Sequence, residues 1–130
     1  MNRKKIMTSN APKAIGPYSQ AIRAEQWIFI SGQLALDPTT NQLVEGDVRV
    51  QTERAILNIR AILQAEGLDL ENIVKTTVFL TDINEFAAFN EVYARYFGES
   101  LPARSAIQAA ALPKGARVEI EAIAWSPVRS

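Results

Sequence analysis

Residues 73–98 read IVKTTVFLTDINEFAAFNEVYARYFG and join a strand to a helix. The first part, 73–81, is rich in β-branched residues, which favour strands. Alternation along this strand predicts one face with Val74, Thr76, Val78 and Leu80 and an opposite face with Ile73, Lys75, Thr77 and Phe79. In the second part, aromatic residues recur at steps of three and four, which predicts a helix over 85–97 with Asn84 as its N-cap and Gly98 at its end.

A second helix and another strand are expected upstream. Apolar residues recur with a helical period from Val48 to Leu63, Asp47 is placed to cap the N-terminus, and Gly67 is placed for a left-handed C-terminal cap. The run WIFIS at 27–31 predicts a strand. The segment APKAIGPYSQA at 11–21 contains prolines and a glycine that predict a loop.

Two further strands are expected downstream, near 104–110 and 117–125. The order of strands, helix, strand, helix and two strands predicts an α+β fold with a mixed β-sheet and both helices on one face. In the last strand, alternation separates Val118, Ile120, Ala122 and Ala124 from Glu119, Glu121, Ile123 and Trp125. The second set mixes apolar and acidic side chains, which suits neither a dry core nor open water, so we expect an oligomer.

Length and composition restrict the class of protein. The 130 residues, 48% of them hydrophobic and 22% charged, predict one soluble globular domain spanning 1–130. The 14 basic and 14 acidic residues cancel, which disfavours nucleic acid as a partner. No apolar stretch is long enough to span a bilayer, so we expect no membrane association and a cytoplasmic location.

The sequence contains neither cysteine nor histidine. Disulfides, thiolate nucleophiles and Ser-His or Cys-His pairs are therefore excluded. We expect no metal site and no cofactor, because only carboxylates and carbonyls are left as ligands and no spaced acidic loop is present. Any general acid or base must be Asp, Glu, Lys, Tyr or a bound water.

Four places could carry chemistry, and each also has a purely structural interpretation. Arg104 begins a strand of small and apolar residues, either as a solvated strand end or as a fork for a carboxylate. Glu119 lies between aliphatic residues, either in an interface ion pair or as an acid with a raised pKa. Tyr18 follows Gly-Pro and either closes a core edge or faces a ligand. Ser31-Gly32 either forms a plain turn or lets a ligand approach the backbone. Together these groups suit proton transfer and water addition to a small anion.

Four segments resemble the RidA family, also called YjgF. The main one is PARSAIQAAALPKGARVEIEA at 102–122, and the others are AIGPYSQA at 14–21, FISGQ at 29–33 and IVKTTVFLTDINEFAAFNEVY at 73–93. The resemblance implies a chorismate-mutase-like fold and a homotrimer whose sheets face inward, with ligand clefts between subunits. It also implies that the last strand lies beside earlier strands and does not form a hairpin with the strand before it.

The resemblance further implies a site and a reaction. Its catalytic residues would be Tyr18, Arg104 and Glu119, and its substrate-binding residues would be Ser31, Gly32, Asn90 and, through the main chain, Ala106. The implied reaction is hydrolysis of 2-imino acids, such as 2-iminopropanoate and 2-iminobutanoate, to 2-keto acids and ammonia. Arg104 would bind the carboxylate and Glu119 would activate water. The alternative is a regulatory trimer that binds a small carboxylate or another protein, without essential catalysis. RNA cleavage is disfavoured by the neutral charge and the absence of histidine.

Overall fold

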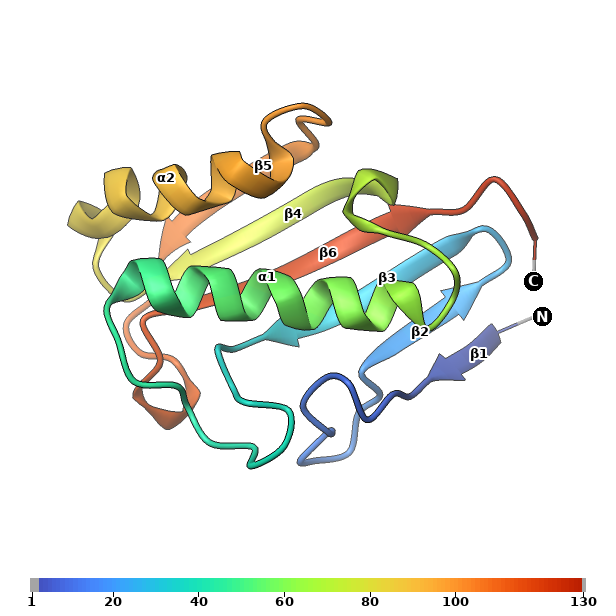
Figure 1. Ribbon diagram of the computed structural model, residues 1–130, viewed down its shortest axis with the longest axis horizontal. Coiled ribbons are helices and arrows are strands. Elements are labelled where there is room, and N and C mark those ends of the chain that lie inside the picture. The colour runs from blue at the N-terminus through green and yellow to red at the C-terminus, as the bar shows by residue number, and fades with distance from the viewer. Residues whose placement is uncertain (1–2, 130) are drawn as a thin grey trace.

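The computed structural model describes residues 3–129 and shows two helices packed on one face of a mixed sheet (Figure 1). The strand order is β1-β2-β3-β6-β4-β5, and all neighbours are antiparallel except the parallel pair β4 and β5. The elements are β1 Arg3–Ile6, β2 Ala21–Ala24, β3 Trp27–Gln33, α1 Val48–Gln64, β4 Ile73–Leu80, α2 Phe86–Phe97, β5 Ala103–Gln108 and β6 Val118–Trp125. The expected α+β fold, with both helices on one face, is confirmed.

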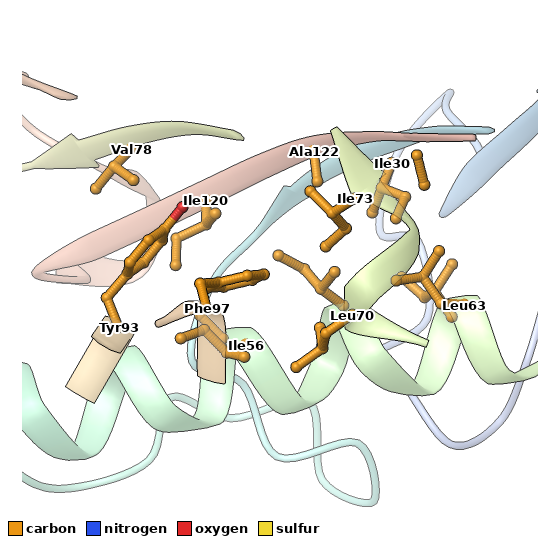
Figure 2. Close-up of a cluster of buried hydrophobic side chains, with 14 of the residues drawn as sticks. Ile30, Ile56, Leu63, Leu70, Ile73, Val78, Tyr93, Phe97, Ile120 and Ala122 are labelled. Atoms are coloured by element: carbon orange, nitrogen blue, oxygen red, sulfur yellow. The ribbon is translucent and has the colours of Figure 1, made fainter. Parts of the chain in front are cut away.

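The core lies between the helices and the sheet. Figure 2 shows Ile56 of α1 and Phe97 of α2 on the side of Ile120 of β6, and Leu63 of α1 below Ile30 of β3. The apolar stripe of α1 is buried as its helical period predicts. Because both helices lie on this one face, no helix of residues 3–129 covers the opposite face of the sheet (Figure 1).

Both predicted caps of α1 are confirmed. The Asp47 carboxylate accepts hydrogen bonds from the backbone N–H groups of the helix's first turn. At the other end Gly67 has a φ of +72°, and the N–H of Leu68 donates to the carbonyl of Leu63 at 3.0 Å. This pattern is the Schellman cap, which favours glycine at the left-handed position.

The predicted N-cap of α2 is wrong. The helix is preceded by a 3₁₀ turn, Ile83–Glu85, and the Asp82 side chain caps that turn by accepting the N–H of Asn84 at 2.9 Å. Asn84 therefore lies inside the turn and not at the helix boundary. A short 3₁₀ turn ahead of an α-helix is a common way to enter it, and it moves the capping group upstream.

Two features of the strands differ from expectation. The strand β2 was not expected; it joins β3 through a tight turn in which Glu25 has a φ of +57°. In β4, a register shift between Ile73 and Lys75 places the first side chains of the strand on the faces opposite to those predicted. Ile73 is therefore buried at 3% exposure, whereas Val74 is 43% exposed. An irregularity of this kind adds a residue and breaks simple alternation.

The last strand is inserted between β3 and β4, so β5 and β6 are not hairpin partners. The arrangement implied by the family resemblance is confirmed on this point. Within residues 3–129, no helix has the length and apolar character needed to cross a bilayer.

Candidate functional site

The predicted site residues lie in two groups on opposite faces of the sheet. Thr76 of β4 is on the helix-covered face, because its hydroxyl is hydrogen-bonded to Tyr93 of α2. Arg104 is the direct neighbour of Thr76 on β5 and shares that face. Glu119 is the neighbour of Phe79, three residues further along β4, and so lies on the open face. One chain does not bring the two groups together.

The first group contains Arg104, Asn90 and Ala106. The Arg104 guanidinium donates from Nη1 to Asn90 Oδ1 at 2.8 Å, and its Cζ lies 4.8 Å from the centroid of the Tyr93 ring. Ala106 lies two residues further along β5 on the same face, opposite Val78. Arg104 is thus exposed but packed and hydrogen-bonded, so it is not simply a solvated strand end.

A cavity of about 450 Å³ adjoins this group. Its lining combines one cation, one amide and an apolar wall, from Asn90, Tyr93, Ala94, Phe97, Gly98, Leu101, Pro102 and Arg104. A guanidinium beside apolar walls can bind a carboxylate that carries a small hydrocarbon group.

The second group is centred on Glu119. Burial, with a smaller effect from the negative charge of Glu121, raises the pKa of the Glu119 carboxyl above its ordinary value. Within residues 3–129, no hydrogen bond or ion pair involves this carboxylate. A carboxyl with a raised pKa and no bound partner is a candidate proton donor and acceptor.

Gly32 makes room for the Glu119 side chain. It lies in the irregular part of β3, where the register shifts between Ile30 and Gln33. A Cβ atom at position 32 would be 2.2 Å from Glu119 Oε2 and 2.8 Å from Cδ. Ser31-Gly32 is therefore part of a bulged strand rather than the plain turn considered above, and the missing side chain sets where the carboxylate lies.

Tyr18 lies in the loop before β2, and Ser31 of β3 contacts that loop. The Ser31 hydroxyl donates to the Ser19 carbonyl at 2.6 Å, which ties β3 to the Tyr18 loop. Tyr18 is 50% exposed and does not close a core edge. Tyr18 and Gly32 line a common cavity of about 40 Å³.

Gln20 was not predicted as part of the site, yet it fixes the shape of this loop. Its buried side chain accepts the N–H of Thr8 at 2.8 Å and donates to the carbonyls of Thr8 and Pro12 at 3.0 and 2.8 Å. Its own carbonyl accepts the N–H of Ser31 at 3.0 Å. The only signal in the sequence is a glutamine close behind a proline-rich loop.

The rings beneath Arg104 were also missed as parts of the site. The helical spacing of Phe86, Phe89, Tyr93 and Phe97 predicts core positions, and all of these except Phe86 are buried. As for metals, residues 3–129 contain no cluster of three or more His, Cys, Asp or Glu side chains that could hold an ion.

Comparison with known proteins agrees with this fold. The family model described as endoribonuclease L-PSP matches residues 8–126. A mouse protein named 2-iminobutanoate/2-iminopropanoate deaminase is 57% identical over 122 residues, which cover 94% of this chain and 90% of the mouse protein.

Two solved structures are also very similar. RidA from the Antarctic bacterium Psychrobacter superimposes with a TM-score of 0.90 at 48% identity, covering 94% of this chain and 98% of that one. Escherichia coli TdcF with bound serine superimposes with a TM-score of 0.88 at 45% identity, covering 98% and 99%. The chain belongs to the RidA (YjgF) family, whose sequence model carries the description endoribonuclease L-PSP.

Proposed function

We propose that this protein is a 2-iminobutanoate/2-iminopropanoate deaminase, which hydrolyses reactive 2-imino acids to 2-keto acids and ammonia. The identity of 57% with the mouse protein of that name, over 94% of the chain, supports the reaction. The observation that carries the proposal is that the chain offers two groups, the packed guanidinium of Arg104 and the carboxyl of Glu119, whose pKa is raised. The two groups supply the charge and the proton transfer that the reaction needs.

We infer that the working site forms between two copies of the chain. Arg104 and Glu119 lie on opposite faces of the sheet, so a substrate that touches both must lie between subunits. The open face carries large apolar side chains that a partner would cover, namely Trp27, Phe29, Ile107 and Trp125. A homotrimer with inward-facing sheets, as the family resemblance implies, would bring Arg104 of one subunit to Glu119 of the next.

In this proposal the substrate carboxylate binds Arg104. Asn90 accepts a hydrogen bond from Nη1, which leaves Nε and Nη2 without a hydrogen-bond partner within residues 3–129. These two nitrogens form the fork that matches a carboxylate. The apolar wall of the adjoining cavity suits the methyl or ethyl group of the two imino acids. The main chain at Ala106 and Gly32, with Ser31 and Tyr18, would orient the imine and the water.

Glu119 then moves protons between water and nitrogen. Its carboxylate accepts a proton from water as the water oxygen bonds to the imine carbon, and it then passes this proton to the imine nitrogen. Glu119 next takes the proton of the new hydroxyl and gives it to the amino nitrogen, so the C–N bond breaks, ammonia leaves and the C–O bond becomes a carbonyl. The products are a 2-keto acid and ammonia, with no change of oxidation state. The raised pKa of Glu119 makes its protonated form easier to reach than that of an ordinary carboxyl, which suits a group that takes up and returns a proton.

The test is ammonia release from freshly generated 2-iminopropanoate, measured against the uncatalysed reaction. The wild-type protein is expected to accelerate release. Arg104→Lys keeps the charge but loses the fork, and the rate is expected to fall at least about tenfold, or about 1.4 kcal/mol. No acceleration by the wild-type protein would refute the proposal, and normal turnover by the Arg104→Lys variant would refute the role of Arg104.

A second candidate function is binding of a small carboxylate without essential catalysis. The observation that favours it is the serine bound in the structure of the similar protein TdcF. A binder needs the cation of Arg104 far more than the acid of Glu119. Glu119→Gln therefore separates the two functions. In a deaminase this substitution would abolish hydrolysis. A protein that only binds the carboxylate would keep its affinity in the variant, and its wild type would not hydrolyse the imine either.

A further inference from the structure

Arg104 lies on β5, at the edge of the sheet, where long side chains usually sample several rotamers. Here its guanidinium packs on aromatic rings of α2. Its Cζ lies 4.8 Å from the centroid of the Tyr93 ring and 5.0 Å from that of Phe86. The ring of Phe89 is 5.9 Å away. All three distances are within the range of about 6 Å over which a ring face attracts a cation.

The Tyr93 ring is itself held firmly. Its hydroxyl forms a buried hydrogen bond of 2.7 Å with Thr76 Oγ1 on β4, the residue directly beside Arg104. The rings of Phe89 and Phe97 lie on either side, with centroids 5.3 and 4.5 Å away. Figure 2 shows Tyr93 extending from α2 toward the sheet, with its hydroxyl at the sheet end. The ring therefore has one fixed orientation.

We infer that Tyr93 is a positioning residue for the carboxylate-binding arginine. Its ring lies against the Arg104 guanidinium, and Asn90 engages that group through Nη1. The remaining edge is then presented in one orientation before the substrate arrives. The entropy cost of ordering a long side chain is met during folding and not during binding. The expected gain in substrate affinity rests on the proposed function, whereas the ordering of the Arg104 side chain does not.

Tyr96 provides a matched control. It also lies on α2, and its hydroxyl is also hydrogen-bonded, to Glu53 of α1 at 2.7 Å, but its ring does not contact Arg104. Calorimetry would measure the binding of pyruvate, the 2-keto acid product. For Tyr93→Leu the dissociation constant is expected to rise about fivefold, which corresponds to about 1 kcal/mol. Tyr96→Leu should stay within about twofold of wild type, as expected for an independent site.

Nuclear magnetic resonance of the ligand-free protein tests the positioning separately. The Nε–H signal of Arg104, assigned by its loss in Arg104→Lys, is expected to be sharp in wild type and Tyr96→Leu. It should broaden in Tyr93→Leu and remain sharp in Tyr93→Phe, which keeps the ring. If Tyr93→Leu does not fold, Phe86→Leu at the half-buried end of α2 replaces it, with the same expected broadening.

An unchanged Arg104 signal in the ring-deleted variant would overturn the inference, and so would unchanged pyruvate affinity in a variant that folds. If the signal broadens as expected but wild type neither binds pyruvate nor hydrolyses the imine, the proposed function fails and the positioning role stands.

Discussion

Replacing Gly32 by alanine is expected to impair catalysis while sparing the fold. The added Cβ would be 2.2 Å from Glu119 Oε2, whereas ordinary contact begins at 3.4 Å, so the carboxylate must retreat by about 1 Å. A displacement of about 1 Å at a reacting group can cost about a hundredfold in rate, or about 2.7 kcal/mol of transition-state stabilisation. Gly32 does not have a positive φ, so alanine introduces no backbone strain.

The assay is ammonia release from 2-iminopropanoate, together with thermal unfolding. The stability of Gly32→Ala should stay within about 0.5 kcal/mol of wild type, because the displaced atoms are the end of a flexible side chain. The matched control is the same substitution in a Glu119→Ala background. There it should have no further effect on the residual rate, because the group it displaces is gone. Near-normal activity of Gly32→Ala, or an equal loss in both backgrounds, would refute the reasoning.

Three further predictions concern the acid, a buried ion cluster and the open face. The pKa of the Glu119 carboxyl is raised in the folded state, so its effect on stability depends on pH. Below pH 4.5 the carboxyl is protonated and does not disfavour folding, whereas its ionisation lowers the free energy of unfolding as the pH rises through the raised pKa. Glu119→Gln should therefore raise the melting temperature at pH 8 but not at pH 4; equal shifts at both would contradict this. Glu66 pairs with the buried Arg23 at 3.3 Å, so Glu66→Gln should cost about 3 kcal/mol in urea unfolding, and a change below about 0.5 kcal/mol would be contrary to expectation. Phe29, 47% exposed on the open face, should be essential to assembly: Phe29→Glu should sediment as a 14.4 kDa particle, whereas the wild type is expected to sediment as a trimer.

The sequence predicts the elements of this fold well because most have a strong local signal. The apolar period of α1, with Asp47 and Gly67 at its ends, depends only on neighbouring residues. The strand β2 was missed because four residues that include a buried arginine, Arg23, give no strand pattern. Its formation depends on pairing with β1 and β3, and on ion pairing of Arg23 with the distant Glu66.

The candidate site could be predicted only in part. The residue types at Arg104 and Glu119 pointed to a carboxylate fork and an acid, and each lies in its expected strand. That they lie on opposite faces follows from non-local register, since each is paired with a different residue of β4. No local pattern contains that information. The support of Arg104 by Tyr93 was missed for the same reason, because a ring with helical spacing indicates only a core position.

The central claim is that each site takes Arg104 from one subunit and Glu119 from another. The direct test is to refold an equal mixture of the Arg104→Ala and Glu119→Ala variants, each inactive alone, and to measure imine hydrolysis. If subunits mix at random and clefts lie between neighbours, about a quarter of the clefts contain both residues, so the mixture should recover about a quarter of wild-type activity. If both residues act within one chain, no cleft is complete, and a mixture as inactive as its parents would contradict the account.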